Sequence, residues 1–139
     1  MAGEMIYNHI KKYIEPTDVV IEVGCGDGYG VAILSSVAKK VVGIDKNKKI
    51  IQKAMLTNKK PNNYFLCNNV DQLPIFPISD VVVAIGVIDK LRFPESFIGK
   101  IIMSTRKMII SDCIIDDGLW KLIEEITSDN NKLMIYHKI

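Results

Sequence analysis

The chain has 139 residues, of which 48% are hydrophobic, so it carries enough apolar material for one core and we expect a single domain over residues 1–139. Its formal net charge is +2, and it has neither an apolar run of the ~18 residues that cross a bilayer nor the ordered basic, apolar and small segments of a signal peptide. These features argue against a membrane protein and favour a soluble, cytoplasmic one. The sequence leaves open whether residues 1–4 are native or an expression scar ahead of Met5.

Apolar runs rich in β-branched residues predict buried strands, and helical spacing between most of them predicts helices. In chain order, we expect strands over residues 19–23, 41–44, 64–67, 81–87, 108–115 and 133–136, and helices over 31–38, 48–58, 95–104 and 119–126. Residues 71–80 are too few and too rich in proline for a full helix, so a loop or a single turn should join the third and fourth strands.

The predicted strands are continuously hydrophobic rather than alternating, which indicates that both of their faces are covered. Together with the strand–helix alternation, this predicts the α/β class: a doubly wound, Rossmann-like, mostly parallel sheet of about six strands with helices on both faces.

Lysines crowd one stretch of the chain. They are Lys39, Lys40, Lys46, Lys48, Lys49, Lys53, Lys59 and Lys60. We interpret this basic patch as a solvated helix face, because it lacks the arginines and interleaved aromatic residues that supply bidentate phosphate contacts and base stacking. A nucleic-acid surface is the weaker alternative.

The cysteines and histidines suggest no metal site. Cys25, Cys67 and Cys113 are an odd number without CxxC spacing, so we predict neither a disulfide framework nor a zinc cluster, and a reducing compartment fits best. His9 and His137 are far apart and unaccompanied, which argues against a histidine-based metal site or catalytic triad.

The most informative stretch, residues 19–30, reads as a strand, a glycine-rich turn and the start of a helix. Glycine at positions 24, 26 and 28 removes Cβ atoms where the turn needs unusual torsions and where a ligand must touch the main chain. The following helix points free N–H groups at the site. A dinucleotide fingerprint, G-x-G-x-x-G, fits neither register, because its third glycine would fall on Tyr29 or Val31.

The segment from Glu22 to Gly28, an acid two residues before a G-x-G-x-G turn, resembles motif I of class I S-adenosylmethionine-dependent methyltransferases. The resemblance spans roughly residues 18–115 and implies S-adenosylmethionine as cofactor and S-adenosylhomocysteine as product. Asp45 ends the second strand, 17 positions after Gly28, where the family's acid accepts both ribose hydroxyls. Asn69 stands where the family's acid accepts from the adenine amino group, and its carbonyl oxygen can still accept.

The resemblance implies a set of cofactor-binding residues around these motifs. They are Glu22, Gly24, Cys25, Gly26, Gly28, Tyr29, Asp45, Lys46, Asn69, Val70 and Ile85. Tyr7 and Tyr29 are in position to close over the methionine end. Asp89 is our candidate catalytic base, because in the family the end of the fourth strand faces the transferable methyl. Residues 86–89 lack the Asp/Asn-Pro-Pro-aromatic motif of enzymes that methylate adenine amines or amide nitrogens, which disfavours that subclass.

Several of these residues have plainer interpretations. Asp45 could cap the helix that begins near Lys48, and Asn69 could belong to an ordinary asparagine-rich turn. We interpret Cys25 as a small residue packed beneath the turn rather than as a nucleophile. The polar residues after the fifth strand are interpreted as a solvated loop or helix cap rather than an acceptor site. They are Asp112, Cys113, Asp116 and Asp117.

The sequence thus predicts a methyltransferase whose acceptor, a macromolecule or a small molecule, is not identified. Two alternatives remain open: a non-catalytic cofactor-binding module or partner subunit of a larger methyltransferase, and another nucleotide-binding Rossmann protein. Six strands leave few residues for an acceptor pocket. That fits an open site for a bulky protein or RNA, a pocket completed by a second subunit or homodimer partner, or a module without turnover.

Overall fold

The computed structural model describes residues 2–128 and 131–139. Met1, one of the four residues that could be an expression scar, lies outside the described residues. The elements in chain order are α1 (Ala2–Ile10), η1 (Lys11–Tyr13), β1 (Val19–Val23), α2 (Tyr29–Ser35), β2 (Lys40–Asp45), α3 (Lys48–Thr57), β3 (Asn63–Cys67), η2 (Val70–Gln72), β4 (Ser79–Ala84), η3 (Ile88–Lys90), α4 (Pro94–Ser104), β5 (Thr105–Ser111), β6 (Trp120–Ser128) and β7 (Asn131–Lys138).

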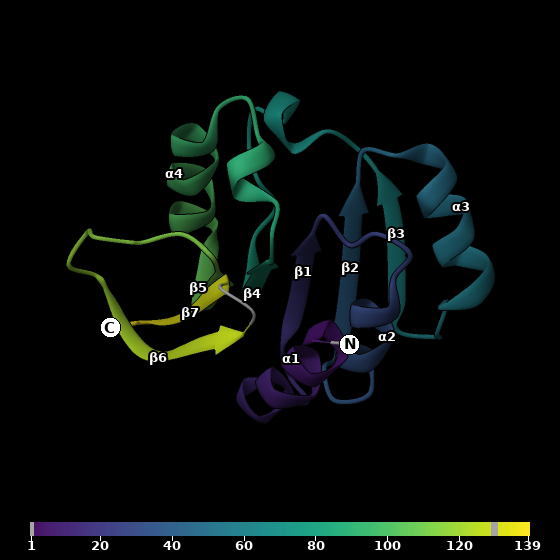
Figure 1. The fold of residues 1–139 in the computed structure, drawn as a ribbon, viewed down its shortest axis with the longest axis horizontal. Helices are drawn as coiled ribbons and strands as arrows, with labels where there is room; N and C mark the ends of the chain where they lie inside the picture. Colours follow the sequence, from purple (N-terminus) through teal and green to yellow (C-terminus); the bar gives the residue numbers. More distant parts are fainter. Residues whose placement is uncertain (1, 129–130) are drawn as a thin grey trace.

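The strands form one seven-stranded sheet in the order β3-β2-β1-β4-β5-β7-β6 (Figure 1). The first five strands of that order pair in parallel. Strand β7 runs antiparallel to both of its neighbours, β5 and β6. The mostly parallel, doubly wound α/β class is therefore confirmed, and the expected count of about six strands is corrected to seven.

The additional strand is β6, where the helix predicted over residues 119–126 is wrong. This segment pairs with β7 from Trp120↔Lys138 to Ser128↔Asn131, and the register shifts between Leu122 and Glu124. Such a shift interrupts the alternation of inward and outward side chains, so the apolar spacing no longer has the period of a strand. Pairing with a later segment decides the structure here.

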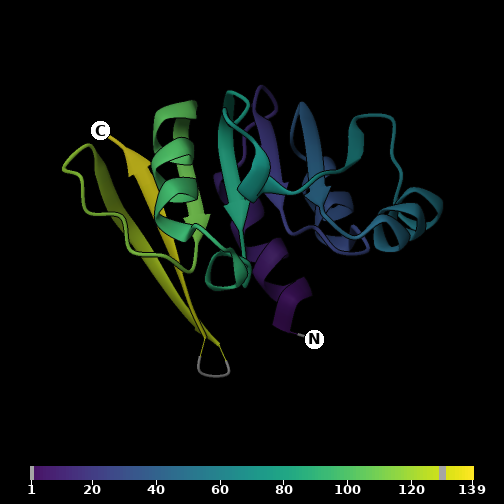
Figure 2. The same ribbon diagram turned by 90° about the horizontal axis from the view of Figure 1, so that it is seen from above.

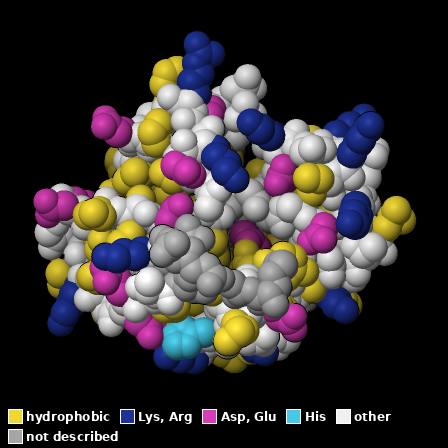
Figure 3. All heavy atoms as spheres, viewed as in Figure 1, with side chains coloured by type: hydrophobic (Ala, Val, Ile, Leu, Met, Phe, Trp, Pro, Cys, Tyr) yellow, Lys and Arg dark blue, Asp and Glu magenta, His cyan; other side chains and the backbone are white. Residues whose placement is uncertain are grey.

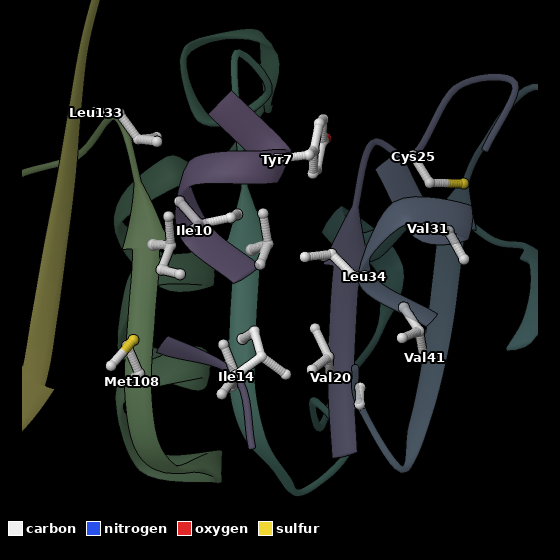
Figure 4. Close-up of a cluster of buried hydrophobic side chains, with 14 of the residues drawn as sticks. Tyr7, Ile10, Ile14, Val20, Cys25, Val31, Leu34, Val41, Met108 and Leu133 are labelled. Atoms are coloured by element: carbon white, nitrogen blue, oxygen red, sulfur yellow. The ribbon is translucent and has the colours of Figure 1, made fainter. Parts of the chain in front are cut away.

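Helices cover the two faces of the sheet unequally (Figure 2). On one face, α1, α2 and α3 bury Ile10, Leu34 and Ala54 in a cluster that reaches β7 (Figure 4). On the other face, α4 buries Phe97 and Ile101 against the sheet. Between β3 and β4 the chain forms only the short turn η2, as the proline-rich link predicts. Within the described residues, no helix combines the length and the apolar content that crossing a bilayer requires.

The N-terminal segment is fastened to the far edge of the sheet by one carboxylate. Glu124 of β6 accepts a hydrogen bond from the Tyr13 hydroxyl, and its Oε1 lies 3.0 Å from Nε2 of His9 and 3.6 Å from Nζ of Lys12. His9 thus belongs to a surface contact between η1, α1 and β6.

Candidate functional site

A cavity of about 300 Å³ opens at the carboxyl ends of β1, β2 and β4. Its walls come from the last residues of β1 and β2, from the residue that follows each of them, and from residues 68–71, 85–87, 90 and 91 after β3 and β4. In the sheet β1 lies between β2 and β4, so the cavity sits where the strand order reverses direction. Ligands of open α/β sheets bind at this point, and the volume lies at the small end of the ~300–1,000 Å³ typical of small-molecule sites.

The glycine turn reaches the cavity wall at Gly24. Gly24, Gly26 and Gly28 all have positive φ, at 72°, 57° and 86°, a conformation that residues with a Cβ rarely adopt. The amides of Gly24 and Cys25 donate to the Ile44 carbonyl at 2.8 and 3.1 Å, which turns the chain over the end of β2. A Cβ on Gly24 would lie 2.9 Å from Cγ2 of Val87, so glycine also allows the opposite wall to approach.

The carboxylate of Asp45 joins the glycine turn to the end of β2. Its Oδ2 accepts from the Gly26 amide and its Oδ1 from the Asn47 amide, both at 3.0 Å. The side chain that caps α3 is that of Asn47, which accepts from the Ile50 amide at 3.1 Å, so the cap interpretation of Asp45 is wrong. A carboxylate offers about four acceptor positions, and these bonds leave two for a ligand in the cavity.

The segment after β3 carries the next polar groups. Asn69 accepts from the Asp71 amide through Oδ1 at 3.0 Å, which is the ordinary asparagine turn considered as an alternative, and one lone pair of that oxygen remains free of this bond. The Asp71 carboxylate in turn accepts from the amides of Arg92 and Phe93 at 2.9 and 3.2 Å. Asp71 therefore ties together the two loops that flank the cavity.

Glu22 lies beneath the turn rather than in the cavity. Its carboxyl is 1% exposed and accepts a hydrogen bond from the Tyr7 hydroxyl, while its Oε1 has no partner among the described residues. Burial raises the pKa of Glu22 to about 8, and the hydrogen bond from Tyr7 opposes the rise. Burial and the nearby Glu22 raise the pKa of Tyr7 as well. The Tyr7 ring meets the Tyr29 ring edge-on at 5.4 Å and fills the space above Gly30.

Cys25 points away from the cavity into the core, where Figure 4 shows it beside Val31. The side chain is buried, and a Cβ on Gly43 would lie 2.9 Å from its Sγ. Burial raises the pKa of the Cys25 thiol. A protonated, enclosed thiol is a poor nucleophile, which favours the packing interpretation.

The structure brings together six of the eleven predicted cofactor-binding residues as cavity lining. These are Gly24, Asp45, Lys46, Asn69, Val70 and Ile85. Glu22, Cys25, Gly26, Gly28 and Tyr29 lie in or behind the turn and are not among the lining residues.

Asp89, the candidate base, is exposed and also lies outside the lining, although its neighbour Lys90 is part of it. Its charge acts on Asp112, which follows β5: burial raises the pKa of Asp112, and Asp89 adds to the rise. The carboxyl groups of Asp89 and Asp112 therefore lie near one another.

Sequence reasoning missed part of the lining. The missed residues are Val23, Ile44, Asn68, Asp71, Gly86, Val87, Lys90 and Leu91. Several of them adjoin predicted site residues and follow once the strand ends are known. The lining residues after β4 were not predicted because the predicted strand extends to Val87, whereas β4 ends at Ala84. The one available signal was Gly86, whose φ of 68° turns the chain back over the cavity.

The fold and this site define a Rossmann-like domain with a cofactor-sized cavity at the point where the strand order of the sheet reverses. A family profile described as a methyltransferase domain matches residues 14–139. The chain therefore belongs to the methyltransferase-domain family.

A probable S-adenosylmethionine-dependent methyltransferase from Mycolicibacterium smegmatis is 31% identical over 98 residues, covering 70% of this chain and 37% of the relative. The chain thus spans little more than a third of the length of the curated relatives that it matches first.

Two solved structures illustrate the fold. The N-methyltransferase NodS from Bradyrhizobium japonicum, in complex with S-adenosylhomocysteine, has a TM-score of 0.80 at 12% identity over 99% of this chain and 85% of that one. A complex between the Haloferax volcanii Trm112 methyltransferase activator and a methyltransferase has a TM-score of 0.75 at 14% identity over 94% and 86% of the two chains.

Proposed function

We propose that this protein is an S-adenosylmethionine-dependent methyltransferase that acts on an acceptor not yet identified. The observation that carries the proposal is the Asp45 carboxylate, which lines the cavity beside the glycine turn with two acceptor positions left over. Two adjacent hydroxyls of a ribose match that number. Membership in the methyltransferase-domain family supports the same cofactor.

The other lining residues fit the remaining parts of the cofactor. The Asn69 carbonyl oxygen would accept from the adenine amino group, and Val70 and Leu91 would give the ring apolar walls. The turn at Gly24 would hold the methionine portion through its main chain, with Ile85 across the cavity. The bound cofactor supplies an electrophilic methyl group on a sulfonium, and its transfer leaves S-adenosylhomocysteine.

Catalysis by the protein then consists mainly of alignment. A methyl transfer to an acceptor that is already nucleophilic needs little acid or base help, and positioning alone can supply ~7–11 kcal/mol of the barrier. The walls at Gly24 and Val87 would exclude water from the reacting atoms. Where an acceptor must lose a proton, we propose Asp89 as the candidate base, with Asp112 near it.

A second candidate function is that of a cofactor-binding module or partner subunit. It is supported by the likeness to a methyltransferase that is solved with an activator. We further propose a cytoplasmic location, which agrees with the free state of Cys25, Cys67 and Cys113.

Calorimetric titration with S-adenosylmethionine, S-adenosylhomocysteine and NAD tests the cofactor proposal. We expect binding of the first two and not of NAD. In Asp45→Asn, one of the two acceptor oxygens becomes a donor, so the affinity should fall ~10- to 100-fold, the value of one hydrogen bond to a charged group. Asp116→Asn, which makes the same change in an exposed loop, is the matched control and should bind as the wild type does.

Two results would refute the cofactor site: no binding of either compound at millimolar concentration, or equal affinities of Asp45→Asn and the wild type. Binding without transfer to any acceptor, together with a gain of activity on adding a partner protein, would favour the subunit over the stand-alone enzyme.

A further inference from the structure

The sheet face beside the cavity is bare along β3. Because Phe65 packs inward with α2 and α3, the alternation of the strand turns Tyr64 and Leu66 to the opposite face. No helix covers them there, since the described chain between β3 and β4 forms only η2. Tyr64 and Leu66 are 47% and 49% exposed.

Positive charge is concentrated around this edge. Residues 39–60 hold eight lysines and one acid, Asp45, whereas the whole chain has a net charge of +2, so the rest of the chain is net acidic. Figure 3 shows lysine and arginine side chains at the right of the molecule, over α3. Among the described residues, no ion pair joins any of these lysines to a carboxylate. Their charges are available to a partner.

The fold also supplies the aromatic residue that the lysine-rich stretch lacks. Strand pairing sets Val42 of β2 opposite Tyr64, which brings the Tyr64 ring to the same end of the sheet as the lysines that flank β2 and β3. The ammonium groups of Lys40 and Lys59 lie 5.1 and 4.7 Å from the centroid of that ring. An exposed aromatic ring beside two cations is the combination that stacks a base and binds its phosphates. The absence of an interleaved aromatic had favoured a solvated helix face.

We propose that the β3 edge of the sheet binds single-stranded nucleic acid, which would pass around this edge strand from the lysines of α3 on one face to the Tyr64 ring on the other. The phosphates would lie on the lysines of α3 and of the β2 and β3 ends, and a base on Tyr64. Helix α3 has ten residues and is therefore ~15 Å long, which is the reach of a few nucleotides. Its N-terminal end adjoins Lys46, a residue of the cavity wall. A bound strand would thus pass the opening of the cofactor cavity.

Nucleic acid fits this surface better than the other possible occupants. A second copy of the chain would bring the same excess of lysine to the contact, and the charges would repel. An acidic protein segment would satisfy the lysines but has no need of an aromatic ring beside two of them. The role of the strand as methyl acceptor rests on the proposed function, whereas the binding itself does not.

The test is fluorescence anisotropy of a labelled mixed-sequence RNA of twelve nucleotides, measured without cofactor at several salt concentrations. Wild-type affinity should fall as the salt concentration rises. A plot of the logarithm of the association constant against the logarithm of the salt concentration should have a slope of about −0.7 for each phosphate contacted. Lys49→Glu with Lys53→Glu, on exposed positions of α3, should weaken binding at least ~10-fold and flatten the slope. The milder Lys49→Gln with Lys53→Gln should fall between that variant and the wild type. Lys121→Glu with Lys132→Glu, on exposed positions of β6 and β7, makes the same charge change at the opposite edge and should leave binding unchanged.

The stacking part is tested separately. Tyr64→Ala should weaken binding ~5-fold or more, and Tyr64→Phe should retain it, because a phenyl ring still stacks. Circular dichroism confirms the fold of each variant.

Several results would overturn the proposal. They are the absence of RNA binding at low salt, an equal loss in the β6–β7 control, or poly-glutamate that competes as well as unlabelled RNA. The last would assign the surface to an acidic protein. Because no cofactor is present, failure of this assay would leave the cofactor proposal standing, and loss of cofactor binding in the calorimetry would leave the RNA affinity unchanged.

Discussion

The carboxyl of Glu22 should govern how the stability of the fold responds to pH. It is buried, and burial raises its pKa from 4.5 to about 8. A carboxyl with a higher pKa in the folded chain keeps a proton that the unfolded chain releases, so the free energy of unfolding falls as pH rises through this window. At ~1.4 kcal/mol per pKa unit, the fall between about pH 5 and pH 8 is about 3 kcal/mol.

Glu22→Gln isolates this contribution. Glutamine keeps the shape of the side chain and an acceptor for the Tyr7 hydroxyl, but it cannot ionise. Urea unfolding of the wild type and the variant at about pH 5, 6, 7 and 8 gives the difference between their free energies of unfolding. The other titrating groups contribute equally in the two proteins, so their contributions cancel in this difference. This difference should grow in favour of the variant by about 3 kcal/mol as pH rises.

Glu95→Gln, at an exposed position in the first turn of α4, controls for the loss of one carboxylate. A difference between wild type and Glu22→Gln that stays constant from about pH 5 to pH 8 would refute the reasoning. It would mean that Glu22 ionises in the folded chain as readily as in the unfolded one.

Three further substitutions test the packing of the fold and of the loops around the site. Gly30→Ala should destabilise the protein by about 1–3 kcal/mol in urea unfolding, because the new Cβ would overlap the Tyr7 ring. Gly99→Ala on α4, where a Cβ meets nothing within 4 Å, should instead stabilise it by about 0.5–1 kcal/mol, and equal effects of the two would contradict this view. Asp71→Ala should cost about 1 kcal/mol of stability and lower cofactor affinity in calorimetry, because the Arg92 and Phe93 amides lose their acceptor. Unchanged affinity would show that Asp71 does not set the width of the cavity.

The parallel half of the sheet was predictable because burial on both faces leaves a direct trace in the sequence. Val19–Val23 and Ser79–Ala84 are nearly continuous apolar runs, and each lies between two other strands. Strand β6 lies at an edge, half-exposed, and its register shift near Leu122 disturbs the alternation. Its structure depends on β7, a partner that no local pattern identifies.

The candidate site could be predicted from the sequence at the positions where the backbone requires a particular residue type. Glycines with positive φ and an acid at a strand end, such as Gly24 and Asp45, are visible as residue types. Residues 87–91 carry no such mark, because they follow the turn at Gly86 that brings the chain to the cavity. The pairing of Asp71 with backbone amides about twenty positions later is likewise a product of the fold.

The antiparallel placement of β7 has a consequence for synthesis on the ribosome. Strand β6 is made before β7, yet β7 is the strand that lies between β5 and β6. A nascent chain that has emerged as far as residue 128 therefore carries β6 without any neighbour to pair with, and its apolar side chains stay accessible until β7 follows. The β6–β7 hairpin must close before or while it joins β5, so this edge of the sheet can fold only after the parallel strands have left the ribosome.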